Sequence, residues 1–415
     1  MPLRHSVFLT ISLPECHHSE RIVISQFQQG EAMRRWRHAH ACLKAWFGLF
    51  VSVGFLGPGS ALAQARDRPP TVPPDFVATP VGYFHRSCIF RVGEDEAVRQ
   101  DYIEKLDGTR RAFGRCARPS FDLAGNPRDL SNAPTATGWL ASSQMWSAPL
   151  EWISATWTVP PPPVVVGSQV IYLFPGLVPG YNSYILQPVL AWNGEAALGQ
   201  RWAIYSWDCC TLGNTFHSDP VPVEPGETIA GFVWGTGCDQ QTGICSDWQV
   251  RTSGQYASST VPSFPPGSVG QALPLAVGGA LEVRNLDSCN QLPPVSAYTF
   301  SNTSVRQVGG ATISPTWAPH VDSTTPACVS SVGVSSSTTT IYRTCESGLT
   351  LCAGVCVDLA SDWRNCGACG RSCPYGCTQG QCNTEPPGGC PVGTIDCCGD
   401  GSCVKPSVCA KIGCL

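Results

Sequence analysis

Tyr184-Ile185-Leu186-Gln187-Pro188-Val189-Leu190 is a short apolar run that carries one amide at its centre. Apolar runs of this length, bounded by Gly, Asn or Pro, are typical of buried β-strands. Similar runs, rich in Val, Ile, Tyr, Trp and Thr, recur on both sides of it: Gln169–Phe174, Trp202–Trp207, Thr228–Trp234, Ala280–Arg284 and Ala297–Phe300. Many short strands separated by turns predict an all-β protein, a β-sandwich or a β-barrel. The one segment that favours a helix is Glu94–Leu106.

The cysteines and the N-terminal stretch predict an exported protein. The chain has 24 Cys in 415 residues, more thiols than a reducing compartment favours. A basic stretch, Met33–Arg37, precedes the apolar run Ala45–Leu56, and the small residues Ala61-Leu62-Ala63 follow. This order is that of a signal peptide, and the run is shorter than the roughly 20 residues that span a bilayer. We therefore expect a secreted protein with no membrane attachment after signal cleavage.

Composition divides the chain into six segments. Residues 66–80 are rich in Pro and Arg, which predicts a linker, and a Cys88–Cys116 disulfide is expected to staple a small subregion after it. The formal net charge of −4 argues against a nucleic-acid partner. The expected segments are a signal peptide with an N-terminal extension (1–65), a linker (66–80), an N-terminal subregion (81–130), the sandwich (131–333), a Ser/Thr-rich linker (334–344) and a cysteine-rich domain (345–415).

The cysteine-rich tail has few large apolar residues, so disulfides must stabilise it. Cys366-Gly367-Ala368-Cys369 has zinc-finger-like spacing. The tail has no His, however, and an exported chain favours disulfides over zinc thiolates, so we expect no metal and no cofactor. The tail resembles the stigma-specific type of cysteine-rich repeat in these positions: Cys352–Asp358, Asn365–Gly370, Cys373, Cys377 and Cys382. The resemblance implies an extracellular module for interaction or stabilisation.

Common catalytic motifs are missing from the sequence of the sandwich. His217-Ser218-Asp219 are adjacent, but neighbours on a strand point to opposite faces and do not form a Ser-His-Asp triad. The sequence has no Gly-x-Ser-x-Gly elbow and no Gly-rich phosphate loop before a helix. After the signal segment only His85, His217 and His320 remain, too scattered for a His-rich metal site. These exclusions leave carboxylate or amide chemistry on a sheet.

Five motifs, in order, resemble the eqolisin or glutamic peptidase family: Gly138–Ala141, Ala155–Pro160, Ile185–Gln187, Trp202–Trp207 and Glu224–Ile229. The resemblance spans Gly138 to Val305. It implies a concanavalin-A-like jelly roll of two antiparallel sheets. It also implies an endopeptidase that works best at acid pH. In that chemistry a carboxylate takes a proton from the attacking water, and a glutamine amide stabilises the developing oxyanion.

Gln187 matches the family's glutamine, and Glu282 is the best match for its glutamate. An amide buried in an apolar strand without partners costs about 1–3 kcal/mol; the alternative for Gln187 is an amide satisfied by neighbouring backbone. The family's glutamate is usually followed by Trp, whereas this chain reads Gly278-Gly279-Ala280-Leu281-Glu282. A shift of one or two residues puts Ala280 at the catalytic position, and Glu282 is then a strand carboxylate beside Arg284.

The aromatic residues of the sandwich point to a groove. Trp139, Trp202, Tyr205 and Trp207 are expected to line it, and exposed aromatics suit a polypeptide substrate and a cell-surface glycan equally well. Two functions therefore stay open: a secreted glutamic endopeptidase without a cofactor, and a non-catalytic extracellular module that binds glycan or peptide. A third is a matrix protein with an adhesive tail. A Glu282 that faces Gln187 closely enough to share a water would favour the peptidase.

Overall fold

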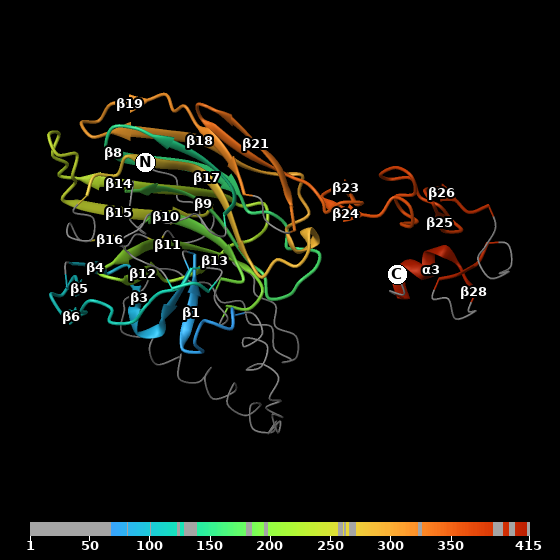
Figure 1. The fold of residues 1–415 in the computed structure, drawn as a ribbon, viewed down its shortest axis with the longest axis horizontal. Coiled ribbons are helices and arrows are strands. Elements are labelled where there is room, and N and C mark those ends of the chain that lie inside the picture. Colours follow the sequence, from blue (N-terminus) through green and yellow to red (C-terminus); the bar gives the residue numbers. More distant parts are fainter. Residues whose placement is uncertain are drawn as a thin grey trace, which may run out of the picture. The chain divides into compact units, whose positions relative to one another are not determined.

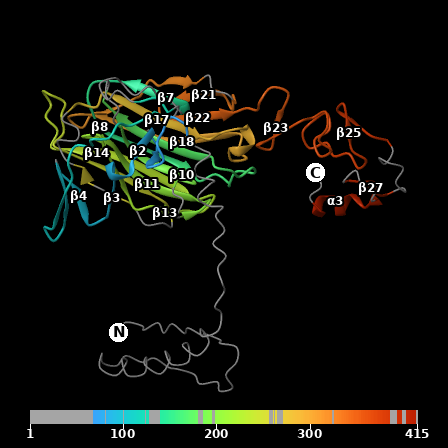
Figure 2. The same cartoon turned by 60° about the horizontal axis from the view of Figure 1, so that its bottom comes forward.

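The computed structural model describes residues 68–412 apart from 81, 100, 123–124, 128–138, 180–184, 195–197, 256–259, 261–262, 265–270, 323–325, 385–392 and 398–402. Two large sheets pack face to face in this part of the chain (Figures 1 and 2). The first sheet has nine strands and the second has eleven. All but two strand pairings are antiparallel, so the predicted two-sheet antiparallel sandwich is confirmed. The predicted signal peptide lies outside the described residues.

The first sheet runs in the order β20 (Ala318–Val321), β7 (Trp139–Trp146), β17 (Leu275–Arg284), β9 (Val170–Val178), β10 (Ile185–Trp192), β11 (Trp202–Thr211), β12 (Asn214–Ser218) and β3 (Ile89–Val92), with β13 (Val221–Pro222) beside β11. The second sheet runs in the order β21 (Val329–Ser335), β22 (Thr338–Arg343), β18 (Ala297–Gln307), β8 (Leu150–Thr158), β14 (Thr228–Thr236), β15 (Asp247–Ser253), β16 (Ser263–Phe264), β4 (Glu96–Val98), β5 (Tyr102–Lys105) and β6 (Arg110–Ala112), with β19 (Thr312–Ile313) beside β18.

Strand β8 illustrates how the sequence produces the sandwich. Its residues alternate, so that Ile153 and Trp157 are buried while Trp152 and Ser154 lie on the other face. The inward side chains of both sheets form two interior clusters, in which Trp157 of the second sheet joins Leu173 of the first. A third cluster lies on the outer face of the first sheet, the face turned away from the second sheet. The first sheet is therefore apolar on both faces, which is unusual for an antiparallel sheet.

The N-terminal segment contributes to both sheets. Strand β3 joins the first sheet, and β4, β5 and β6 extend the second. Hairpin strands β1 (Phe76–Thr79) and β2 (Gly82–His85) precede the short 3-10 turn η1 (Arg86–Cys88). The predicted Cys88–Cys116 disulfide is confirmed. The helix predicted at Glu94–Leu106 is wrong, because this segment forms the antiparallel pair β4 and β5 with Val98 and Ile103 buried.

Gly279 lies in a β-bulge of β17 and has no room for a side chain. A Cβ at this position would overlap the Phe300 ring, which is fully buried in the interior between the sheets. We expect Gly279→Ala to lower the free energy of unfolding by about 2 kcal/mol, because overpacking a dense core costs roughly 1–3 kcal/mol. Urea unfolding measures the change. Gly114→Ala is the matched control, since a Cβ there contacts nothing within 4 Å, and equal stability of the two variants would contradict this account.

The tail is built from small hairpins and disulfides. Its elements are β23 (Thr350–Cys352), β24 (Val355–Val357), β25 (Cys377–Thr378), β26 (Gln381–Cys382), β27 (Ile395–Asp396), β28 (Cys403–Val404) and the short helix α3 (Pro406–Ile412). Its described disulfides are Cys345–Cys356, Cys352–Cys369, Cys366–Cys377, Cys373–Cys382 and Cys397–Cys409. In the sandwich, Cys238 pairs with Cys245 and Cys289 pairs with Cys328. None of the described helices is both long and apolar enough to cross a membrane.

Candidate functional site

Gln187 lies near the middle of β10, on the outer face of the first sheet. Trp207 on β11 is its cross-strand neighbour. The side chain is 1% exposed, and its amide oxygen accepts no hydrogen bond from the described residues. A buried amide oxygen without a donor is unfavourable by about 1–3 kcal/mol. No backbone donor among the described residues satisfies this oxygen, and the role of Gln187 in a site stays a prediction.

Glu282 lies near the end of β17, on the same face of the sheet. Its neighbours are Tyr172 on β9 and Trp139 on β7. The residue is 0% exposed, and its Oε1 lies 3.6 Å from Nη2 of Arg284, which is two residues further along the strand. The alternative interpretation from the sequence, a strand carboxylate beside Arg284, describes this geometry. The carboxylate is buried rather than solvated.

The strand registers separate Gln187 from Glu282. Strand β9 lies between their strands, so they are two strand spacings apart, about 9–10 Å. Glu282 is level with Tyr172, and Tyr172 is level with Ala191, four residues beyond Gln187 on β10. Four residues add about 13 Å along the strand. The two side chains share a face of the sheet, but they do not lie close enough to share one water.

The β17 residues nearest in register to Gln187 carry no carboxylate. Gln187 is level with Gly176 on β9, because their neighbours Leu186 and Leu177 pair, and Gly176 is in turn level with Val277. The register shifts after Val277, and pairing resumes at Ala280. Val277 and Ala280 both belong to the cluster on the outer face. Ala280, the alternative position for the catalytic glutamate, is therefore closer to Gln187 along the strand than Glu282 is.

Three of the four predicted groove aromatics lie on this face. Tyr205 and Trp207 belong to the outer cluster, and Trp139 packs against it. Trp202 does not, because it lies an odd number of residues from Tyr205 and Trp207 and faces the interior. It is 1% exposed and packs there against Trp192, with ring centroids 5.5 Å apart. Trp202 is a core residue.

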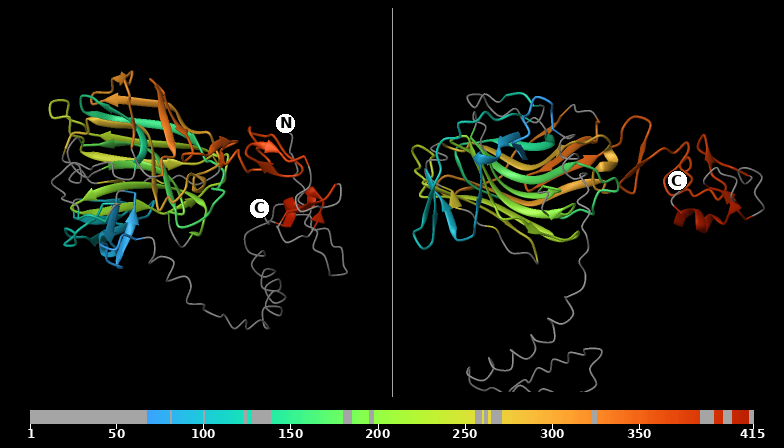
Figure 3. Two further views of the ribbon diagram at one scale, coloured as in Figure 1. Left: turned by 45° about the vertical axis from the view of Figure 1, so that its right-hand side comes forward. Right: turned by 90° about the horizontal axis from the view of Figure 1, so that it is seen from below.

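The N-terminal hairpin covers part of the outer face. The strands β1 and β2 can be followed in the ribbon of Figure 3. Phe84 of β2 belongs to the outer cluster, and the Tyr83 ring lies 5.5 Å from the Arg284 guanidinium carbon. The Tyr172 ring lies 5.4 Å from the same carbon, so Arg284 contacts two tyrosines. Burial raises the pKa of Tyr172 to about 12, so this residue is a neutral phenol at any physiological pH. This cover cannot be recognised from the sequence, where its one signal is the aromatic pair that follows Gly82.

His217, Ser218 and Asp219 do not assemble a triad. The His217 ring stacks on Trp207 with centroids 4.5 Å apart, whereas the buried Ser218 hydroxyl accepts from Ser206 N at 2.9 Å. Asp219 Oδ1 lies 3.3 Å from Nε of Arg91. The alternation along β12 sends adjacent side chains in opposite directions, as predicted.

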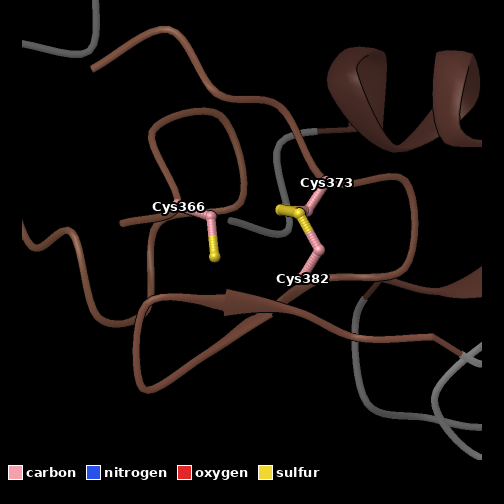
Figure 4. Close-up of side chains that lie close together, drawn as sticks. All are labelled: Cys366, Cys373 and Cys382. Carbon is pink, nitrogen blue, oxygen red and sulfur yellow. A yellow bond between two sulfur atoms is a disulfide. The ribbon is translucent and has the colours of Figure 1, made fainter. Parts of the chain in front are cut away.

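Two groups of described residues have metal-like spacing, and both contain disulfides. Cys366, Cys373 and Cys382 lie together, but Cys373 bonds Cys382 (Figure 4) and Cys366 bonds Cys377. The second group combines the Cys289–Cys328 disulfide with Glu346, whose carboxylate accepts from Cys289 N at 2.5 Å. Sulfur in a disulfide is not a thiolate ligand. Neither group is a metal centre while its disulfides are intact.

Comparison with known proteins identifies one family region. The family model described as the Stigma-specific STIG1-like protein family matches residues 315–385. The match includes β20, β21 and β22 of the sandwich as well as the first tail hairpins. The many disulfides and this region are typical of an extracellular protein. No curated protein sequence matches the chain.

Among solved structures, the chain is similar to scytalido-glutamic peptidase bound to a peptide-based transition-state analogue. The TM-score is 0.36 at 15% identity, and the match covers 50% of this chain and 98% of the other. The chain is also similar to SCP-B, a member of the eqolisin family of peptidases, in a complex with the tripeptide Ala-Ile-His, with a TM-score of 0.35, 15% identity and the same coverage. Both belong to the family that the sequence resembles. The similarity concerns the fold and carries no argument about activity.

Proposed function

We propose that the chain is an extracellular binding protein that does not hydrolyse peptide bonds. The observation that carries this proposal is the register of β17, which puts Val277 and Ala280, rather than a carboxylate, beside Gln187. General base catalysis needs a base within hydrogen-bond reach of the attacking water, about 2.6–3.2 Å. A glutamine amide stabilises an oxyanion but does not take up a proton at physiological or acid pH.

The environment of Glu282 supports the same proposal. The guanidinium of Arg284 lies within ion-pair distance of its carboxylate, and the residue is fully buried. Phe84 of the N-terminal hairpin packs on the same face of the sheet. An extended polypeptide needs an open groove along these strands, and the buried state of Gln187 and Trp207 supports a filled face instead.

The competing function is a glutamic endopeptidase with Gln187 as oxyanion stabiliser and Glu282 as general base. The amide oxygen of Gln187 favours it, because that oxygen has no described donor and is suited to accept from a bound water. In this function Trp139, Tyr205 and Trp207 would contact the polypeptide substrate. The peptidase requires either a large movement of β17 or a base other than Glu282.

Proteolysis of denatured casein between pH 2 and pH 7 separates the two functions. We expect no hydrolysis by the wild-type chain, Gln187→Ala or Glu282→Gln at any pH. The N-terminal hairpin covers part of the face that carries Gln187, so its removal could change the activity. The chain is therefore preincubated at acid pH, and mass spectrometry shows whether the N-terminal segment has been cleaved off before the assay. Acid hydrolysis by the wild type that is lost in both variants would overturn the proposal and establish the peptidase.

A further inference from the structure

The four central strands of the second sheet are β18, β8, β14 and β15 (Figure 1). Their outer face carries an ordered set of side chains. One row across β18, β8, β14 and β15 is Arg306, Trp152, Trp234 and Gln249. The next row on the same strands is Ser304, Ser154, Phe232 and Arg251. All eight side chains are half-buried or exposed, whereas the residues between them along each strand are buried.

Trp152, Phe232 and Trp234 form a continuous surface, which we call the aromatic platform. The Trp152 ring centroid lies 5.9 Å from that of Phe232 and 6.2 Å from that of Trp234. The indole N–H of Trp152 donates to Ser154 Oγ at 3.3 Å, which orients the ring. Within the described chain, β8 and β14 pack chiefly against their neighbours in the second sheet and against strands of the first sheet. All three rings of the platform are half-buried, and neighbouring aromatic side chains that keep part of their surface exposed are candidates for an interaction site.

Two arginines flank the aromatic platform without acidic partners. Arg306 stacks on Trp152, with its guanidinium carbon 4.1 Å from the ring centroid, and Arg251 is the cross-strand neighbour of Phe232. Neither has a carboxylate within ion-pair distance among the described residues, although five other arginines do: Arg91, Arg99, Arg110, Arg111 and Arg284. A stacked guanidinium keeps its N–H edge available for a bidentate contact with a carboxylate.

Sheet stability alone accounts for only part of this arrangement. Cross-strand aromatic pairs contribute roughly 0.2–1 kcal/mol each to a sheet, which explains why rings meet on β8 and β14. It does not explain unpaired positive charge at opposite corners of the platform in a chain whose net charge is −4. The two arginines are three strand spacings apart across the sheet and two residues apart along it, about 16 Å in all. An elongated ligand with negative charges along its length would contact both.

We propose that this face binds an acidic polysaccharide that carries uronate carboxylates. The C–H faces of the sugar rings would pack on Trp152 and Trp234, and the carboxylates would pair with Arg306 and Arg251. The hydroxyls of Ser154 and Ser304 and the amide of Gln249 supply polar contacts around the rings. The strands of this face are paired on both sides, so they offer no free edge for peptide backbone pairing, which favours a glycan over a polypeptide. The site lies on the opposite side of the sandwich from Gln187, so it does not depend on whether the first sheet is catalytic.

Binding of the full-length chain to polygalacturonate, measured by isothermal titration calorimetry and tryptophan fluorescence, tests the proposal. We expect Trp234→Ala and Arg306→Gln each to weaken binding about tenfold, which corresponds to ~1.4 kcal/mol. Trp146→Ala is the matched control, because Trp146 is 56% exposed but lies on β7 of the first sheet, and we expect it to bind like the wild type. Raising the salt concentration should weaken the wild type more than Arg306→Gln, since salt screens exposed charges.

Three outcomes would overturn the proposal. They are no measurable binding by the wild type, equal binding by the wild type and both platform variants, and equal binding of polygalacturonate and polyglutamate. Equal binding of polyglutamate would mean that charge alone attracts the ligand and that the rings are not used. Thermal unfolding of each variant identifies a loss of binding that comes from a loss of fold. Casein hydrolysis would contradict the proposed function but would leave this binding site in place.

Discussion

Arg284→Ala is expected to lower the free energy of unfolding by about 3–5 kcal/mol, because it leaves a buried carboxylate without its guanidinium. Glu282 is 0% exposed and the Arg284 side chain is 2% exposed, so water does not replace the lost partner. The variant also removes the guanidinium between the Tyr83 and Tyr172 rings, which attaches the N-terminal hairpin to the first sheet. Urea unfolding followed by tryptophan fluorescence measures the loss.

A double variant distinguishes the ion pair from simple packing. Replacing both residues, as Glu282→Leu with Arg284→Met, is expected to be less destabilising than Arg284→Ala alone, since apolar residues often replace a buried ion pair at little cost. Arg251→Ala, on an exposed arginine without a described acidic partner, should change the stability by less than about 0.5 kcal/mol. If Arg284→Ala were as mild as Arg251→Ala, the buried pair would not stabilise the contact between the hairpin and the sheet.

The sandwich itself could be predicted from the sequence because alternation along a strand is a local property. Buried and outward residues alternate along β8 and β14 as they alternate in the sequence, and apolar runs such as the one around Gln187 mark strands that are covered on both faces. The disulfide Cys88–Cys116 and the cysteine-rich tail also follow from spacing and composition. These features need no knowledge of how distant strands align.

The geometry of the site could not be predicted, because it depends on register. The bulge after Val277 decides which residue of β17 lies beside Gln187, and Gly279 is required there by Phe300, a residue of the other sheet. A motif comparison along the sequence allows either Ala280 or Glu282, and only strand pairing separates the two. The expectation that Trp202 lines the groove does not fit the strand for a simpler reason. Trp202 lies an odd number of residues from Tyr205 and Trp207, so the strand period of two turns its side chain toward the interior.

The segment Glu94–Leu106 shows how charge can hide a strand. Its charged residues fall on most faces of a helix, but Val98 and Ile103 are the residues that decide its structure, because both are buried against the second interior cluster. The strands β4 and β5 form a hairpin in which Glu96 is opposite Lys105 and Val98 is opposite Ile103. Opposite charges across a hairpin are favourable, so a charged sequence is compatible with a hairpin near the edge of the sheet.

The tail is expected to lose its structure when one of its disulfides is removed, because little else stabilises it. The buried apolar residues of the described tail are all half-cystines: Cys352, Cys356, Cys366, Cys373 and Cys409. A disulfide closing a loop of about 15 residues contributes roughly 3 kcal/mol by restricting the unfolded chain. The Cys373–Cys382 bond closes a loop of sequence separation 9 around the β25–β26 hairpin. We expect Cys373→Ser with Cys382→Ser to abolish amide protection in that hairpin, as measured by hydrogen exchange.

The matched control is Cys238→Ser with Cys245→Ser in the sandwich. That disulfide closes a loop of sequence separation 7 between β14 and β15, so its loop is of similar length. The two strands, however, pair over seven positions from Ala230 to Thr236 and contribute the buried residues Val233 and Val250 to the core. We therefore expect the control to keep amide protection in β14 and β15. Equal loss of protection in both double variants would contradict this account, because it would mean that the sandwich depends on its disulfides as strongly as the tail does.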